Sequence, residues 1–167
     1  GTRHSSVEIG IETGSYRLMN EHMKGKMLPY KPKEWHDVVT KGIEIMNENQ
    51  IWPLGTLIIG LPGENEKDTI ETLELLDKLK HNKVCYVPVL FTSEEDCMLK
   101  EARHMQLKHL TPLQWELIAT CWRHNIDVFI SKKEYWKIKF GTMITYAIYY
   151  RWKHGRKILK PLMKFSG

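Results

Sequence analysis

The chain has 167 residues, of which 42% are hydrophobic and 27% are charged, and its net charge is +5. This size and balance fit one ordinary globular domain and exclude a disordered or fibrous chain. Its three cysteines, Cys85, Cys97 and Cys121, lack the spacing of a disulfide framework or of a four-cysteine metal site. The sequence shows no signal peptide and no apolar run near the roughly 18 residues of a membrane span, so we expect a cytoplasmic protein.

The charge is divided unevenly along the chain. Residues 131–167 contain ten Lys or Arg and a single acid, Glu134, which gives a net charge of +9, whereas residues 1–130 carry −4. A shift of this kind indicates an appendage with its own partner. We therefore expect a mildly acidic globular body and a basic, aromatic-rich C-terminal helix over about 132–152.

Three segments have the pattern of β-strands. Residues 7–12 alternate between apolar and polar or small side chains. Residues 54–60 are almost continuously apolar, which predicts a strand buried on both faces. Residues 84–87 begin a third strand, which meets Pro88 near its end.

Helices are expected between these strands. The first follows Ser15, a candidate cap, and ends at Gly25. The second helix, over about 33–48, has one apolar stripe made of Trp35, Val38, Val39, Gly42, Ile45 and Met46. The third helix begins at Asn65, which with Asp68 resembles a capping pair.

The alternation of strands and helices with short connections predicts βαβ units and a parallel sheet. Beyond Thr92 the pattern becomes helical. Glu94-Glu95-Asp96 has the composition of a charged first helical turn. Residues 111–114, Thr-Pro-Leu-Gln, predict a further helix start, with Thr111 as the cap and Pro at the first position.

Two of the expected strand ends carry residues suited to ligand binding. The first is Gly-Ile-Glu-Thr-Gly-Ser at 10–15, and the second is Ile-Ile-Gly-Leu-Pro-Gly-Glu at 58–64. In parallel α/β proteins, ligands bind at the carboxyl ends of strands. Glu12 can accept hydrogen bonds from sugar hydroxyls or an ammonium group, and Lys24 offers a cation for a carboxylate or phosphate. Glycines at 60 and 63 let the backbone approach a flat ligand closely.

Taken together and in this order, three segments resemble the second half of the barrel of radical S-adenosylmethionine (radical SAM) enzymes, in particular the cobalamin-binding-like Fe–S oxidoreductase group. They are VEIGIETGSYRLMNEHMKG (7–25), KEWHDVVTKGIEIMNEN (33–49) and TLIIGLPGENEKDTIETLELLDKL (56–79). The resemblance covers about residues 5–92 and continues more weakly through 110–126. It implies an α/β fold with a partial parallel (β/α) TIM-like barrel of about three strands over 1–92. A helical region over 93–130 and the basic C-terminal helix over 131–167 would follow.

The resemblance also implies roles for individual residues. Glu12 matches a polar residue that binds the ribose or amino group of S-adenosylmethionine, and Lys24 matches a basic position that meets its carboxylate. Ile58, Gly60 and Leu61 match the strand segment that packs on and hydrogen-bonds the adenine. The full set of candidate cofactor-binding residues is Glu12, Ser15, Lys24, Ile58, Gly60, Leu61, Gly63 and Val87.

The sequence departs from the family in what it lacks. The CxxxCxxC loop that holds the family's [4Fe–4S] cluster is absent, as are the first three strands of the barrel. We therefore expect a fragment that is inactive by itself. In the complete protein the cluster would reduce S-adenosylmethionine to methionine and a 5′-deoxyadenosyl radical, and cobalamin is a further candidate cofactor. Three strands cannot close a barrel, so exposed sheet edges predict a homodimer of the fragment.

Other interpretations stay open. The chain could be a non-catalytic interaction module derived from such a barrel, docking through residues 131–167 on a membrane or an acidic partner, with nucleic acid less favoured. A barrel without redox chemistry could instead bind a phosphate ligand at Gly60–Gly63. Cys121 and His124 share a helical face, and with Cys97 or His104 they are remote candidates for zinc ligands.

Overall fold

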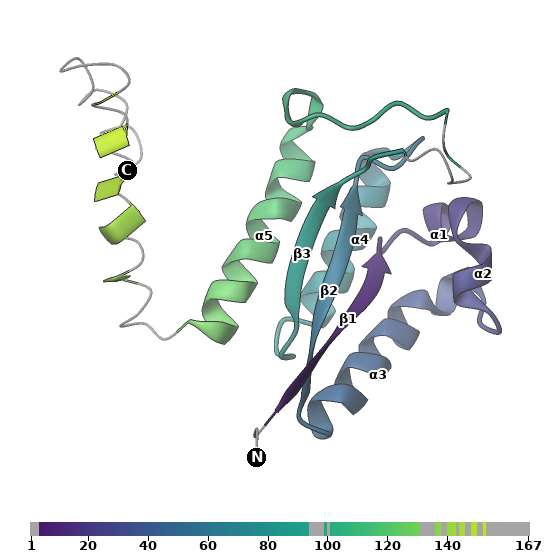
Figure 1. Cartoon of the computed structure of the whole chain (residues 1–167). Helices are drawn as coiled ribbons and strands as arrows, with labels where there is room; N and C mark the ends of the chain where they lie inside the picture. Colours follow the sequence, from purple (N-terminus) through teal and green to yellow (C-terminus); the bar gives the residue numbers. More distant parts are fainter. Residues whose placement is uncertain are drawn as a thin grey trace. The chain divides into compact units, whose positions relative to one another are not determined.

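Three parallel strands form the sheet at the centre of the described part of the chain (Figure 1). They are β1 (Ser5–Glu12), β2 (Ile51–Ile59) and β3 (Cys85–Leu90), and they lie in the order β1-β2-β3. The computed structural model describes residues 4–93, 99, 101–130, 136–137, 140–142, 144–145, 148–149 and 152. It divides the chain into two compact units, Gly1–Phe129 and Ile130–Gly167. The mixed α/β class and the parallel sheet predicted from the sequence are confirmed.

Helices fill the connections between the strands. Their bounds are α1 (Tyr16–His22), α2 (Lys24–Met27), the 3-10 helix η1 (Pro32–Glu34), α3 (Trp35–Glu48), α4 (Glu66–Lys78), the 3-10 helix η2 (Leu107–His109) and α5 (Pro112–Phe129). Two helix starts follow the capping chemistry in the sequence. Asn65 and Asp68 form a reciprocal capping box on α4, and Thr111 and Gln114 exchange the corresponding bonds at the start of α5.

Several local predictions are wrong in detail. Gly25 does not end a helix: α1 ends at His22, and Gly25 lies inside α2. On α3 the buried side chains include Ile43, whereas Ile45 is exposed, so the buried stripe is rotated from the predicted one. Helical structure was expected beyond Thr92, but the described residues 101–106 lie outside any helix. The charged segment Glu94-Glu95-Asp96 lies outside the described residues.

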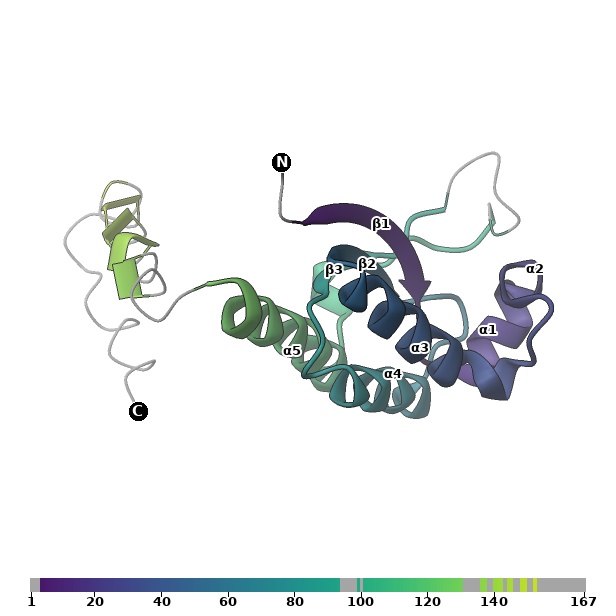
Figure 2. The ribbon, with the colours of Figure 1, turned by 90° about the horizontal axis from the view of Figure 1, so that it is seen from below.

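Among the residues that the structure describes, helices cover one face of the sheet. Figure 2 shows α3, α4 and α5 on the same side of the three strands. Residues that point toward these helices, such as Ile11, Leu57 and Tyr86, are buried. On the other face, which we call the open face, Leu54, Val87 and Val89 are 37–41% exposed. The prediction that β2 is buried on both faces is therefore wrong, because the described helices cover only one face of the strand.

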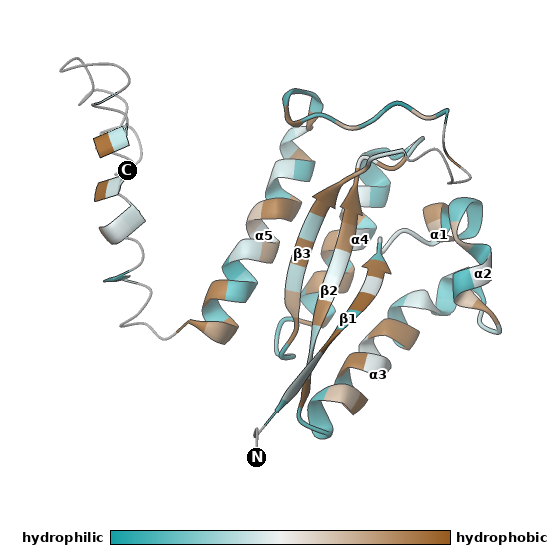
Figure 3. Ribbon diagram, in the orientation of Figure 1, coloured by the Kyte–Doolittle hydropathy of each residue, from teal (hydrophilic) through white to brown (hydrophobic). Residues whose placement is uncertain are grey.

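Although one face of the sheet is open, hydrophobic residues occur along all three strands (Figure 3).

The strand β3 extends two residues beyond Pro88, to Leu90. A proline is tolerated there because β3 lies at an edge of the sheet and one side of its backbone needs no ladder partner.

The second unit, Ile130–Gly167, is described only in part. Its described residues are 136–137, 140–142, 144–145, 148–149 and 152, and all of them are helical. The remainder of the helix predicted over 132–152 lies outside the described residues. Within the portion of the chain that is described, no helix combines the length and the apolar character needed to cross a bilayer.

Candidate functional site

The carboxyl ends of β1 and β2 lie side by side and bring the two predicted motifs to one edge of the sheet. Glu12 is the last residue of β1, and Gly60 directly follows β2. The register shifts between Gly10 and Glu12, and Glu12 has a positive φ of 66°. This turn folds the Glu12 side chain back over Gly10, where a Cβ would overlap its carboxylate. Gly10 thus leaves the space that the Glu12 carboxylate and the Lys26 ammonium group occupy.

Lys26 is the cation beside Glu12. Its ammonium group forms an ion pair with the Glu12 carboxylate, and it also lies against Gly10. Lys24, the basic residue that the sequence indicated, is exposed and makes no ion pair with the residues that the structure describes. The short helix α2 accounts for the difference, because it turns the chain between these two lysines.

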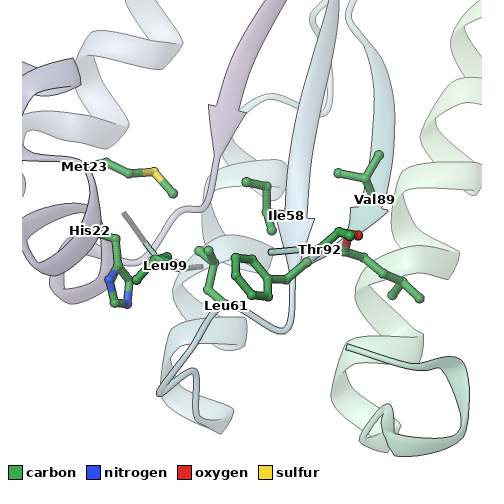
Figure 4. Close-up of a pocket in the computed structure, with 9 residues that line it drawn as sticks. His22, Met23, Ile58, Leu61, Val89, Thr92 and Leu99 are labelled. Atoms are coloured by element: carbon green, nitrogen blue, oxygen red, sulfur yellow. The ribbon is translucent and has the colours of Figure 1, made fainter. Parts of the chain in front are cut away.

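An apolar pocket of about 560 Å³ opens at this same edge (Figure 4). Ile58 from β2 and Leu61 from the following turn contribute to its wall, and both were predicted from the sequence. The side chains of His22 and Met23 approach from α1 and its end (Figure 4). The other lining residues are Val89, Leu90, Phe91, Thr92 and Leu99. A pocket of this size and lining suits a flat, largely apolar group with few polar atoms.

The turn at Gly60 is held by a carboxylate from its own chain. Gly60 has a φ of 82°, and its N–H and that of Leu61 donate to one oxygen of Glu64 at 2.8 and 3.1 Å. The other oxygen accepts from Thr69 at 3.1 Å and from Gln114 of α5 at 2.7 Å. Glu64 thus satisfies the backbone donors that the glycine-rich turn would otherwise offer to a ligand.

Ser15 has a structural role in this arrangement. Its hydroxyl accepts from the N–H of Leu18 as the cap of α1, as predicted, and donates to Asp68 at 2.6 Å. Ser15 is fully buried and does not line the pocket. Gly63 has a φ of 76°, and its carbonyl accepts a hydrogen bond from the guanidinium of Arg17 at 2.7 Å. Gly63 also does not line the pocket.

Asp68 connects the two motifs. Besides Ser15, it accepts from the guanidinium of Arg17 at 2.6 Å and from the N–H of Asn65 at 2.8 Å. Burial favours its neutral form, but the hydrogen bonds from Arg17, Ser15 and Asn65 outweigh this effect and hold the pKa of Asp68 below its ordinary 3.8. The segment 12–15 and the start of α4 are therefore fixed to each other.

Val89 and His22 are among the pocket-lining residues that the sequence analysis missed. Val87, the predicted residue on β3, points to the open face but does not line the pocket; Val89, two residues later, does. The strand period of two makes this shift predictable once β3 is known to extend to Leu90. The Nε2–H of His22 donates to the carbonyl of Pro62 at 2.9 Å, a contact that no local pattern reveals.

The described residues do not support a zinc site. They contain no group of three or more His, Cys, Asp or Glu side chains placed to hold a metal ion. The Nε2–H of His124 donates to the carbonyl of Val84 at 3.1 Å, and burial raises the pKa of the Cys121 thiol to about 12. A thiol with so high a pKa is a poor metal ligand. Cys97, a further candidate ligand, lies outside the described residues.

Neither the protein-family models nor the curated proteins compared with this chain give a match. The functional interpretation therefore depends on the motifs and on the geometry of the carboxyl edge of the sheet.

Proposed function

We propose that the carboxyl edge of β1, β2 and β3 binds S-adenosylmethionine, and that the chain is the S-adenosylmethionine-binding part of a radical SAM iron–sulfur enzyme. One observation carries the proposal: the Glu12–Lys26 pair and the apolar pocket at Ile58 and Leu61 share one edge of the sheet. S-adenosylmethionine joins a flat adenine to a methionyl group that bears both an ammonium and a carboxylate. A ligand of this kind needs an apolar wall and a pair of opposite charges within one molecular length.

Each part of the ligand has a counterpart at this edge. The adenine would pack between Leu61, Ile58 and Phe91, which line the pocket. Glu12 would accept from the ammonium or from a ribose hydroxyl, and Lys26 would donate to the carboxylate. Binding would exchange the internal ion pair for two charged hydrogen bonds to the ligand, so neither Glu12 nor Lys26 would be left without a partner.

The one-sided sheet supports the barrel in this proposal. Strands of a (β/α) barrel have helices on their outer face and side chains packed in layers on their inner face. Here α3, α4 and α5 cover one face (Figure 2). The exposed apolar residues Leu54, Val87 and Val89 lie on the other face. We propose that the open face is the inner face of such a barrel, to which these three strands contribute a segment.

The cysteines of this chain do not fit an iron–sulfur cluster. Cys121 is buried with a raised pKa, Cys85 lies within β3, and the sequence has no CxxxCxxC motif. No electron-transfer step is therefore assigned to these residues. Their part in the proposal is to bind and orient S-adenosylmethionine.

A phosphate ligand at Gly60–Gly63 is disfavoured by the same geometry. The N–H groups of Gly60 and Leu61 already donate to the carboxylate of Glu64. A phosphate would have to displace this carboxylate or approach it against like charge. The structure thus favours a ligand that packs on Leu61 over one that is cradled by the turn.

Calorimetric titration of S-adenosylmethionine into the 167-residue chain tests the proposal. Glu12→Gln and Lys26→Gln should each weaken binding about tenfold, because each removes a charged hydrogen bond. Glu8→Gln on the same strand and Lys24→Gln on the same short helix are the matched controls and should leave the affinity unchanged. Adenosine alone should bind more weakly and should not respond to Lys26→Gln.

The proposal is overturned if S-adenosylmethionine does not bind, or if Glu8→Gln and Lys24→Gln weaken it as much as the test variants do. Saturable binding of inorganic phosphate that competes with S-adenosylmethionine and is abolished by Lys26→Gln would also contradict it. That result would place a simple anion site at this edge.

A further inference from the structure

A stripe of large apolar side chains is exposed in the second unit, Ile130–Gly167. Each of these side chains is 46–82% exposed, and hydrophobic residues recur along the described pieces of this unit (Figure 3). They recur every fourth residue, and each lies in a helical stretch. They are Trp136, Phe140, Ile144, Ile148 and Trp152, which we call the apolar stripe.

A spacing of four residues keeps the apolar stripe on one side of a helix. Each residue of an α-helix turns the chain by about 100°, so successive members are offset by about 40° and the five together span about 160°. Tyr149, on the following position after Ile148, is also exposed. On a helix, this spacing places the five side chains on one broad apolar face with a tryptophan at each end.

The charges of the segment lie on either side of its uncharged centre. The 11 residues from Phe140 to Tyr150 contain no charged side chain. The ten basic residues are Lys132, Lys133, Lys137 and Lys139 before this centre, and Arg151, Lys153, Arg156, Lys157, Lys160 and Lys164 after it. With Glu134 as the single acid, the segment is strongly cationic.

We propose that residues 131–167 bind the surface of a bilayer that contains anionic lipid. Such a surface takes both features at once, because anionic headgroups attract lysine and arginine while the acyl boundary accepts the apolar stripe. Trp136 and Trp152 have the amphipathic side chains that are enriched at membrane interfaces. This inference is independent of the binding of S-adenosylmethionine.

Nucleic acid or an acidic protein would use fewer of these features than an anionic bilayer would. A phosphate backbone is bound chiefly through cations, and it would leave the apolar stripe in water. An acidic protein would need an apolar groove of matching length beside its charges. An anionic bilayer needs no such special shape, so it is the partner that the observations favour.

The segment is suited to lie on the bilayer and not to cross it. An α-helix of eleven residues, the length of the uncharged centre, extends about 16 Å, roughly half of the thickness of the hydrocarbon core.

Co-sedimentation of the 167-residue chain with vesicles tests the proposal. Vesicles of equimolar phosphatidylcholine and phosphatidylserine should bind the chain, and vesicles of phosphatidylcholine alone should bind it at least about tenfold more weakly, since each lysine near an anionic surface contributes about a fivefold gain. Phe140→Asp with Ile144→Asp should abolish binding to both. Ile70→Asp on α4 is the matched control, because Ile70 and Ile144 are equally exposed, at 44% and 46%.

A second pair of variants separates charge from apolar contact. Lys137→Gln with Lys139→Gln should weaken binding to the anionic vesicles at least tenfold without altering the far-ultraviolet circular dichroism, whereas Lys41→Gln with Lys67→Gln should have no effect. Equal binding to both kinds of vesicle overturns the proposal, as does unchanged binding of the Phe140→Asp/Ile144→Asp variant. Binding to polyuridylate or polyglutamate in place of vesicles would overturn it in favour of a nucleic-acid or acidic-protein partner.

Discussion

Asp68 shows how one buried carboxylate can fix two distant parts of a chain. Ser15, 53 positions earlier, and Arg17 both donate to it, and so does the N–H of Asn65 at the start of α4. The side chain is almost completely buried, while Arg17 remains partly exposed. Removing the charge therefore leaves several donors without their acceptor in a place that water reaches poorly.

We expect Asp68→Asn to lower the free energy of unfolding by roughly 2 kcal/mol at neutral pH, because the amide cannot accept all of these hydrogen bonds. Urea unfolding followed by tryptophan fluorescence measures this change. Asp77→Asn, at an exposed carboxylate paired with Lys80, should change the value by less than about 0.5 kcal/mol. Equal effects of the two variants would show that the hydrogen bonds around Asp68 contribute no more to the free energy of unfolding than an exposed ion pair does.

The pH dependence of unfolding should identify the same carboxyl group. The pKa of Asp68 is held below its ordinary 3.8 in the folded chain. As the pH falls below that value, the unfolded chain takes up a proton before the folded chain does, so this contribution to stability is lost as the pH falls through the folded pKa. Asp68→Asn should flatten this part of the stability curve, and an unchanged slope would contradict the assignment.

Residue roles could be predicted from the sequence where they depend on neighbours within four positions. The caps at Ser15, at Asn65 with Asp68 and at Thr111 with Gln114 are all of this kind. The pairing of Glu12 with Lys26 could not be predicted, because it depends on the bulge in β1 and on where α2 turns the chain.

Among the elements, the loop between β1 and α1 packs so closely on α4 that Gly14 has no room for a side chain. A Cβ on Gly14 would lie 2.5 Å from the Cα of Thr72 and 2.6 Å from the carbonyl oxygen of Glu71. Both are helix backbone atoms and cannot move aside cheaply. The N–H of Gly14 also donates to the hydroxyl of Thr72 at 2.9 Å.

Gly14→Ala should therefore lower the free energy of unfolding by about 1–3 kcal/mol. Gly42→Ala on α3 is the matched control, because a Cβ there meets nothing within 4 Å. Since alanine favours a helix over glycine by roughly 0.5–1 kcal/mol, this control should stabilise the chain. Thermal unfolding of the two variants should shift in opposite directions, and a shift in the same direction would rule out the close packing at Gly14.

The class and order of the elements could be predicted from periodicity, but their environment could not. The almost continuously apolar residues 54–60 predicted that β2 is buried on both faces, yet burial alternates along the strand. A hydrophobic sequence shows which side chains avoid water, whereas the covering of a second face depends on other segments. The rotated stripe on α3 has a similar origin, because Ile43 and Ile45 are equally apolar and only packing separates them.

At the scale of the whole molecule, the described sheet has two unpaired edges and an apolar open face. β1 and β3 are the edge strands, and Val7 and Val87 on them are exposed. Edges of this kind favour pairing with another chain. The part of the chain that the structure describes thus retains the features from which a homodimer was expected.

We expect the 167-residue chain to elute as a dimer in size-exclusion chromatography with light scattering. Val7→Lys with Val87→Lys should shift it toward monomer, because a lysine on an edge strand opposes strand pairing. Ile70→Lys on α4, at an equally exposed position away from the sheet, should leave the dimer intact. A parent chain that elutes as a clean monomer would contradict the expectation.

The bonds of Glu64 have a mechanical consequence for the pocket. One oxygen holds the N–H of Leu61, and the other holds the side chain of Gln114 at the start of α5. The wall against which an adenine would rest is thereby braced by a helix 50 positions further along the chain. Gln114 of α5 thus helps to hold the pocket wall in place, although α5 follows the three strands and their connecting helices in the chain. Loss of the Gln114–Glu64 hydrogen bond would therefore make the wall more mobile without changing any side chain that lines the pocket.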